Sequence, residues 1–398
     1  MKIEITDRLK KLPPYLFIEI DKMKRKAREE GVDIIDLGIG DPDLPTIKPV
    51  IEEMQKEIWD ERNHQYPLGS GLKDFRVAVT EWYKKRFNVD FDPDTEAMAL
   101  IGSKEAIGHL PLAFINPGDV VLVPDPGYPV YNAGTIFAEG VPYIMPLLEK
   151  NGFLPDLDSI PAEVLKKAKL MFINYPNNPT AAIAPKSFYE KVVAFAKKNN
   201  IIVCHDAAYS EMYYEGEKSQ SFFNADGAKE VGIETHSFSK TFNMTGWRIG
   251  YAVGHKDLIA GLASVKGNLD SGQFHAIQRA GIKALNLPEK WTKDLRKIYE
   301  ARRDVLVSGL KSLGWTVNNP KATFYIWIKV PEKFKEENKS VKSISSELVK
   351  FLLQNCGIVS TPGVGFGRYG EGYIRMTICT TEERLKEAVK RLKEKCRF

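Results

Sequence analysis

The chain has 398 residues, of which 43% are hydrophobic and 27% are charged. This length and composition allow a large buried core, predict two domains, and exclude disordered and collagen-like classes. The net charge of +5 is small and spread along the chain, so it suits anionic ligands and gives no argument for a nucleic-acid partner.

The spacing of the cysteines and the lack of a long apolar segment indicate a reducing compartment. Cys204, Cys356, Cys379 and Cys396 include no Cys-x-x-Cys pair, which favours free thiols in a reducing compartment over disulfides or a zinc site. We therefore predict no metal site. The charged start of the chain does not resemble a signal peptide, and no run of about 18 apolar residues exists. We expect a cytoplasmic protein without membrane contact.

The first hundred residues predict an arm followed by helices. An extended proline-containing arm precedes a predicted helix over 16–30 and a short strand over 34–37. The glycine-rich turn that follows contains Gly40, which permits close approach of the backbone to a ligand. Further helices are predicted over 47–60 and 72–87.

From residue 98 onward, short apolar segments alternate with helical patterns, as in a mostly parallel α/β sheet. The predicted strands cover 98–101, 120–123, 141–145, 170–173, 201–203, 231–235 and 249–253. Helices are predicted over 103–114 and 188–199. Open α/β sheets bind ligands at the carboxyl ends of their strands, so polar residues at those ends are the candidate site.

Lys240 is the central candidate. It is predicted in a loop between two strands, with Ser237 and Ser239 before it and Arg248 eight residues after it. A lysine amine can condense with the aldehyde of pyridoxal phosphate, while hydroxyls and a guanidinium hold the phosphate. The same amine could move the proton between Cα and the cofactor's C4′. The alternative is a surface loop that is merely basic.

Polar residues at other strand ends suit the same cofactor. Asp206 can bond a protonated pyridine nitrogen, and Asn178 and Tyr209 can bond the phenolic oxygen. Tyr128 can stack on the ring. Each residue alone could be a turn, a cap or part of the core, but their order along the chain before Lys240 favours the cofactor site.

Ser103 and Lys104 begin the helix predicted over 103–114. Ser103 is expected to cap that helix, and the unpaired N–H groups of its first turn suit a phosphate. We expect Pro111 to bend the helix. These residues are therefore predicted at the phosphate end of the cofactor.

The last third of the chain predicts a second unit. A helix over 274–285 precedes a long amphipathic helix over 290–313 that should join two domains. Strands over 322–330 and 373–379 alternate with helices over 345–355 and 382–395, and the charged run 332–342 is expected to be a solvated loop. We find no internal repeats.

These motifs together resemble the class I/II aminotransferases, which are fold-type I pyridoxal-phosphate enzymes. The resemblance implies an α/β fold with a mainly parallel seven-stranded sheet in a large domain, and a smaller α+β domain. The implied boundaries are 1–45 for the arm and part of the small domain, 46–287 for the large domain and 288–398 for the rest of the small domain. Ala181 departs from the glycine that is common in the family.

The resemblance also implies partners and a carboxylate site. Small amino and oxo acids are the implied substrates, and a homodimer with shared active sites is implied, in which Tyr66 matches the phosphate-binding tyrosine from the other subunit. Arg375, on a predicted strand after a glycine-rich loop, matches the arginine that clamps the substrate α-carboxylate. A planar guanidinium can bind that group at two points.

A finer resemblance is to the branch of the family that exchanges an amino group between LL-2,6-diaminopimelate and 2-oxoglutarate. The substrate-binding residues that it implies are Tyr15, Gly40, Lys104, Tyr128, Asn178, Asn268 and Arg375. Aminotransferases for aspartate, alanine or aromatic amino acids remain alternatives, as does a carbon–sulfur β-lyase. Tyr209 favours transamination over the lyase. A non-catalytic regulator would need a DNA-binding module, for which the arm before residue 40 is too short.

Overall fold

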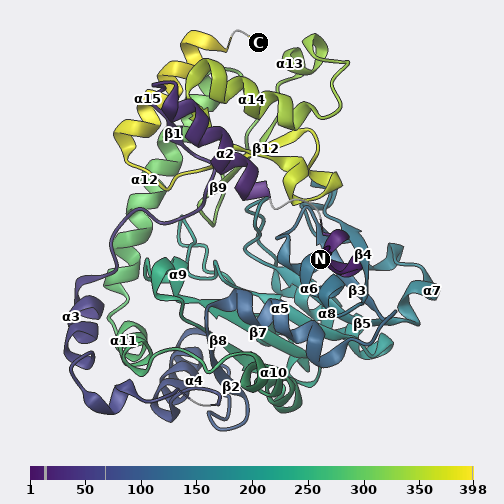
Figure 1. The fold of residues 1–398 in the computed structure, drawn as a ribbon, viewed down its shortest axis with the longest axis vertical. Helices are drawn as coiled ribbons and strands as arrows, with labels where there is room; N and C mark the ends of the chain where they lie inside the picture. Colours follow the sequence, from purple (N-terminus) through teal and green to yellow (C-terminus); the bar gives the residue numbers. More distant parts are fainter. Residues whose placement is uncertain (13–15, 68, 397) are drawn as a thin grey trace.

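The computed structural model describes residues 1–12, 16–67, 69–396 and 398. Figure 1 shows a larger lower part around a central sheet and a smaller upper part that contains the C-terminus, whereas the N-terminus lies beside the lower part. The central sheet has seven strands in the order β2-β8-β7-β6-β5-β3-β4, and β8 alone runs antiparallel to its neighbours β2 and β7. The predicted mainly parallel sheet is therefore confirmed.

The strands of this sheet lie where the apolar segments predict them. Their bounds are β2 (Ala97–Leu100), β3 (Val120–Asp125), β4 (Val141–Pro146), β5 (Ala168–Asn174), β6 (Ile202–Asp206), β7 (Gly232–Ser237) and β8 (Gly250–Gly254). Every residue of β2, β3, β7 and β8 is buried. Continuous burial is expected when helices cover both faces of a sheet.

Two hydrophobic clusters occupy the two faces. Val120 and Leu122 of β3 belong to one cluster, and Val121 and Val123 belong to the other, because successive strand residues point to opposite faces. The first face is covered by α3 (Lys48–Glu57), α4 (Lys73–Phe87), α8 (Lys186–Asn199) and α11 (His275–Leu285). The second is covered by α5 (Ser103–Phe114), α6 (Val130–Phe137) and α10 (Lys256–Leu269).

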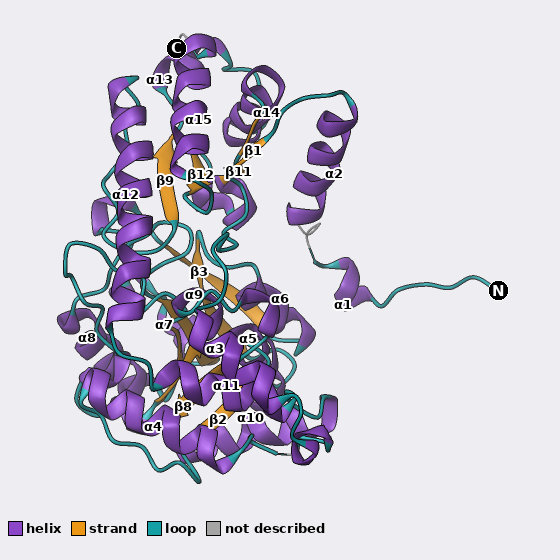
Figure 2. Ribbon diagram, turned by 90° about the vertical axis from the view of Figure 1, so that its left-hand side faces the viewer, coloured by secondary structure: helices purple, strands orange, loops and turns teal. Residues whose placement is uncertain are grey.

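The upper part contains three short strands, β11 (Thr361–Pro362), β12 (Tyr373–Thr377) and β9 (Tyr325–Lys329), paired antiparallel in that order. A segment from the N-terminal part of the chain joins the C-terminal part where β1 (Ile35–Asp36) pairs in parallel with β10 (Ile358–Val359). Figure 2 shows α12 (Lys290–Ser312) running along the molecule from the lower to the upper part. The remaining helices are α1 (Asp7–Lys10), α2 (Leu16–Glu29), α7 (Ala162–Leu165), α9 (Phe238–Thr241), α13 (Glu332–Glu337), α14 (Ile344–Cys356) and α15 (Glu382–Lys395). The domain boundaries stay a prediction.

Several local expectations were wrong. The charged run 332–342 is not all loop, because α13 forms there and buries Phe334. Lys240 lies in the single turn of α9, not in an open loop. The N-cap of α5 is Gly102, and no side chain caps that helix, so Ser103 is its first helical residue.

The helices α6 and α10 are among those not predicted from the sequence. Each contains a glycine at a close contact with α5. A Cβ at Gly134 would lie 3.2 Å from the carbonyl oxygen of Ile107, and a Cβ at Gly261 would lie 2.4 Å from the ring of Phe114. These glycines allow close approach between helices rather than ending them.

No helix in the described residues is long and apolar enough to cross a membrane.

Candidate active site

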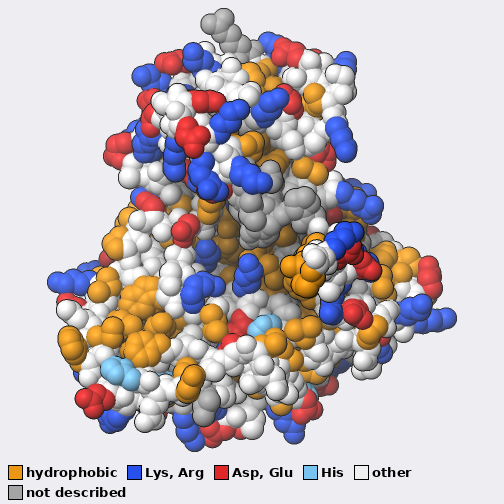
Figure 3. All heavy atoms as spheres, in the orientation of Figure 1, with side chains coloured by type: hydrophobic (Ala, Val, Ile, Leu, Met, Phe, Trp, Pro, Cys, Tyr) orange, Lys and Arg blue, Asp and Glu red, His pale blue; other side chains and the backbone are white. Residues whose placement is uncertain are grey.

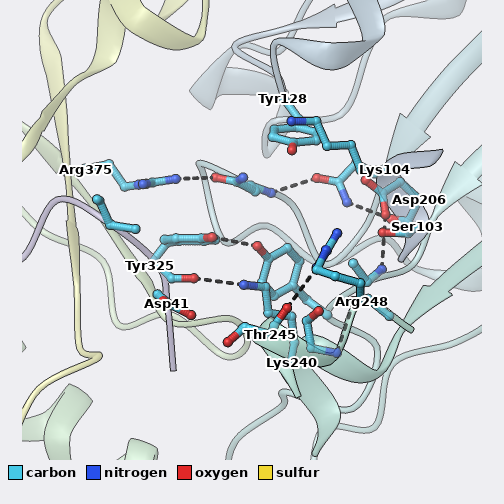
Figure 4. Close-up of a pocket in the computed structure, with 18 residues that line it drawn as sticks. Asp41, Ser103, Lys104, Tyr128, Asp206, Lys240, Thr245, Arg248, Tyr325 and Arg375 are labelled. Atoms are coloured by element: carbon cyan, nitrogen blue, oxygen red, sulfur yellow. Dashed lines mark hydrogen bonds between the residues drawn. The ribbon is translucent and has the colours of Figure 1, made fainter. Parts of the chain in front are cut away.

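A cavity of about 410 Å³ opens at the carboxyl edge of the central sheet, below the three-stranded sheet. Figure 4 shows its side chains, with Arg375 on the opposite side of the cavity from Ser103 and Arg248. Twelve of the predicted site residues line it: Gly40, Ser103, Lys104, Tyr128, Asn178, Asp206, Tyr209, Ser237, Ser239, Lys240, Arg248 and Arg375. Residues from seven separate stretches of the chain thus meet in one place.

Lys240 projects into this cavity from α9. Its Nζ donates a hydrogen bond of 2.8 Å to the carbonyl oxygen of Gly40. Burial lowers the pKa of this amine below its usual value, and the nearby guanidinium groups of Arg375 and Arg248 lower it further. A larger fraction of the amine is therefore neutral at a given pH, as both condensation with an aldehyde and removal of a proton require.

Asp206 is the last residue of β6 and is 5% exposed. Its Oδ2 accepts a hydrogen bond of 2.8 Å from the Tyr131 hydroxyl, and its Oδ1 accepts one of 3.3 Å from the Ala208 N–H. In the described part of the chain it forms no ion pair with a lysine or an arginine, and burial raises its pKa. A cationic ring nitrogen beside Asp206 would lower that pKa, and Asp206 lines the cavity in which such a ring would lie.

One end of the cavity contains two cationic side chains, Lys104 and Arg248, and the N-terminus of α5. Arg248 donates 2.9 Å and 3.4 Å hydrogen bonds to the carbonyl oxygens of Thr245 and Ile101. A Cβ at Gly102 would lie 2.7 Å from its Nη2, so the glycine lets the guanidinium reach the start of α5. Partial burial and the charge of Arg248 lower the pKa of Lys104. Two cations at a helix N-terminus form a suitable site for a phosphate dianion.

Two serines complete this end of the cavity. Ser237 caps α9, and its Oγ accepts a hydrogen bond of 3.2 Å from the N–H of Ser239. Both serines line the cavity together with Thr245. Hydroxyl groups at these places can bond further phosphate oxygens.

Arg375 forms the opposite end of the cavity. Its side chain is 1% exposed, and it donates a 2.8 Å hydrogen bond to Asn178 Oδ1 and a 2.7 Å bond to the Gly38 carbonyl oxygen. The guanidinium lies 4.2 Å from the centre of the Tyr325 ring and 4.7 Å from that of Phe366. A guanidinium fixed in this way can present the edge of its planar group to a carboxylate.

Three predicted residues are not placed in the cavity. Tyr66 is 79% exposed and belongs to the surface. Asn268 is exposed near the end of α10, where its side chain bonds the Ser264 carbonyl oxygen at 2.8 Å. Tyr15 lies outside the described residues.

The backbone conformation of Ala181 is unusual, because its φ of 59° is in the left-handed region that favours glycine.

Other cavity-lining residues were not predicted as site residues: Ile39, Asp41, Asn174, Ala208, Thr245 and Tyr325. The most informative is Tyr325, whose hydroxyl lies 2.6 Å from that of Tyr209. On the antiparallel pair β9·β12, Tyr325 is opposite Thr377 and Trp327 is opposite Arg375. Since alternate residues share a face, Tyr325 and Arg375 point the same way. The place of Tyr325 in the cavity could be predicted from the sequence only if that strand register were known.

A group of possible metal ligands lies behind the first turn of α5. Glu105, His109 and Asp270 have ligand atoms within 4.8 Å of one another. The buried Lys266 ammonium donates 2.7 Å hydrogen bonds to Glu105 Oε1 and Asp270 Oδ1. Lysine already supplies the positive charge there, and the group ties the end of α10 to the first turn of α5.

The family follows from comparison with known proteins. The model of the family described as aminotransferase class I and II matches residues 32–392. The chain therefore belongs to the class I and II aminotransferases, and it is an aminotransferase.

Particular relatives narrow this class. The chain is 55% identical over 390 residues to the LL-diaminopimelate aminotransferase of Aquifex aeolicus, with 98% of each chain covered. It is 52% identical to the protein of the same name from Moorella thermoacetica, with 97% of each covered. Among solved structures, substrate-bound BacF from Bacillus subtilis superimposes with a TM-score of 0.93 at 38% identity, covering 98% of each chain.

Proposed function

We propose that this aminotransferase moves an amino group from LL-2,6-diaminopimelate to 2-oxoglutarate, using pyridoxal 5′-phosphate. The observation that carries the proposal is the identity of 55% over 98% of the chain to a protein named for that substrate. The product amino-ketone would cyclise to tetrahydrodipicolinate, with L-glutamate as the second product. The four free thiols suit the cytoplasm, where such a biosynthetic reaction would take place.

The donor set of the cavity supports this cofactor. Lys240 would bind its aldehyde, Asp206 its ring nitrogen, and Asn178 and Tyr209 its phenolic oxygen. Ser103, Ser237, Ser239 and Arg248 would hold the phosphate, and Tyr128 would cover the ring. When bound, pyridoxal phosphate supplies an aldehyde for the amines and a ring that withdraws electrons from the substrate Cα.

Three side chains of the cavity would then have separate roles in the reaction. Arg375 would bind the α-carboxylate at two points and so fix the direction of the Cα–H bond. Lys240 Nζ, with its lowered pKa, would take the proton from Cα. Asp206 would stay ionised beside the ring nitrogen and hold its proton there. Burial of Arg375 and Asp206 keeps water from competing for these contacts.

Lys104 is the proposed reader of the distal carboxylate that diaminopimelate and 2-oxoglutarate share. It lies in the first turn of α5 and lines the cavity. Losing its charge removes a charge-assisted hydrogen bond of about 1.5–3 kcal/mol. Lys104→Gln should therefore lower kcat/KM about ten- to a hundred-fold for both substrates while barely changing alanine, if alanine reacts.

The direct test is the reaction of the wild-type enzyme with LL-diaminopimelate and 2-oxoglutarate, followed by glutamate formation. Aspartate, alanine and tyrosine serve as competing amino donors. An enzyme that ignores diaminopimelate but uses aspartate or tyrosine would refute the substrate assignment. Pyruvate released from cysteine conjugates without an oxo-acid acceptor would indicate the β-lyase instead.

We further propose a homodimer in which Tyr66 reaches the partner's phosphate site. Ile51, Ile58 and Trp59 are 43%, 44% and 82% exposed, and Figure 3 shows hydrophobic side chains gathered over α3. An exposed apolar patch of this kind favours a protein partner, and the exposure of Tyr66 leaves it available to a second copy.

Mixing experiments can test the shared site. Tyr66→Phe and Lys240→Ala should each be weakly active or inactive alone. A mixed dimer contains one site with both Lys240 and Tyr66, so mixing should restore activity. Trp59→Lys should lower the mass measured by light scattering, whereas Phe137→Lys, on α6 at the other face of the sheet, should not. No recovery on mixing would contradict the shared site.

A further inference from the structure

Tyr325 is a buried residue of β9 whose hydroxyl takes part in one hydrogen bond among the described residues. Its side chain is 3% exposed, and its hydroxyl lies 2.6 Å from the Tyr209 hydroxyl. Among the described residues, that hydroxyl has no other hydrogen-bond partner. A Cβ at Gly40 would lie 2.5 Å from the Tyr325 hydroxyl oxygen, so the backbone of Gly40 closes that side against water.

The two hydroxyls have one proton each, and their directions are coupled. Burial raises the pKa of both tyrosines above the usual value, so neither is ionised near neutral pH. One proton lies between the two oxygens, and either oxygen can be the donor. If Tyr209 gives its proton to Tyr325, it has none to give to a ligand; if it accepts from Tyr325, its own proton is free for one.

The guanidinium of Arg375 favours the second arrangement. It lies 4.2 Å from the centre of the Tyr325 ring, and a cation over a phenol makes its hydroxyl a stronger donor. An acceptor in the cavity beside Tyr209 selects the same direction, because hydrogen bonds in a chain strengthen one another when they all point the same way.

We propose that Tyr325 is a positioning residue that donates to Tyr209 and thereby directs the Tyr209 proton to the phenolic oxygen of the cofactor. This inference rests on the proposed function, in which Tyr209 bonds that oxygen. Tyr325 also contacts Arg375, so one side chain joins the carboxylate end of the cavity to the group that tunes the cofactor.

The test is the midpoint pH of the absorbance change of bound pyridoxal phosphate, measured in tyrosine-to-phenylalanine variants without substrate. A donor to the phenolic oxygen favours the deprotonated form, so its loss raises the midpoint. Tyr209→Phe should raise it by about 1–2 pH units, as expected for a hydrogen bond to a charged group. Tyr325→Phe should raise it by roughly 0.1–0.6 units, since cooperative strengthening amounts to about 10–30% of a bond.

Tyr214 offers a matched control. It is 1% exposed, its hydroxyl donates a 2.6 Å hydrogen bond to the Thr323 carbonyl oxygen, and the Arg303 guanidinium lies 4.9 Å from its ring centre. Tyr214 does not line the cavity. Tyr214→Phe should lower the melting temperature about as much as Tyr325→Phe, with no change in the midpoint.

The double variant shows whether Tyr325 acts through Tyr209. The midpoint of Tyr209→Phe/Tyr325→Phe should equal that of Tyr209→Phe alone. A Tyr325→Phe midpoint equal to that of Tyr214→Phe, or a shift that persists without the Tyr209 hydroxyl, would overturn the inference and leave the proposed function intact. A wild-type protein that binds no pyridoxal phosphate would overturn both.

Discussion

Replacing Arg375 by lysine tests the proposed carboxylate clamp. Among the described residues, the guanidinium makes buried hydrogen bonds of 2.8 Å to Asn178 and 2.7 Å to Gly38, and lies against the Tyr325 and Phe366 rings. Lysine keeps the charge but presents a single point of contact to the carboxylate. Losing one charge-assisted hydrogen bond of about 1.5–3 kcal/mol lowers kcat/KM about ten- to a hundred-fold.

Most of that loss should be in KM, because the clamp binds the carboxylate before and during the reaction. Stability should also fall by about 1–3 kcal/mol, since one buried acceptor, on Asn178 or Gly38, loses its donor. The assay is the single-turnover absorbance change of the cofactor at several concentrations of the amino donor, with unfolding by urea measured in parallel. Titration with pyridoxal phosphate should show unchanged cofactor affinity.

Arg302 provides the control for loss of a buried guanidinium. It is 5% exposed, bonds both carboxylate oxygens of Asp43 at 2.7 and 3.0 Å, and does not line the cavity. Arg302→Lys should reduce stability and leave KM unchanged. If Arg375→Lys bound the amino donor within about twofold of wild type, or if both variants raised KM equally, the clamp assignment would be refuted.

Three further predictions concern single residues. Lys240→Ala should still bind pyridoxal phosphate through its phosphate but form no covalent link, and should lose turnover by several orders of magnitude; near-normal turnover would exclude the assignment. Asp206→Asn should lower kcat far more than it raises KM, and a change in KM alone would contradict its role at the ring nitrogen. Asp125 accepts 3.0 Å hydrogen bonds from the N–H groups of Arg368 and Tyr369, and burial raises its pKa to about 6. Its stabilising contribution is complete below its unfolded pKa of 3.8 and is lost as pH rises through about 6. The free energy of unfolding in urea should therefore rise for Asp125→Asn relative to wild type as the pH rises from 4 to 7, by up to about 3 kcal/mol. A difference that stays constant would show that Asp125 does not titrate in this range.

The sequence by itself predicted the central sheet and most of the cavity. Apolar runs bounded by turn residues located the strands, because segments buried on both faces must be apolar throughout. The run 170–173, for example, lies inside β5 (Ala168–Asn174). Asp206 was found because polar residues at the carboxyl ends of parallel strands share one edge of the sheet, and Lys240 because serines and an arginine surround it in the sequence.

Only the tertiary structure decided which distant side chains touch. Tyr325 is an ordinary strand residue by sequence, and it becomes part of the cavity because the β9·β12 register sets it on the same face as Arg375. The same packing closes the Gly40 turn over its hydroxyl. Conversely, Asn268 matched a motif but lies on an exposed part of α10. Local patterns determine where elements form, whereas contacts between elements depend on register and close packing, which no short stretch of sequence contains.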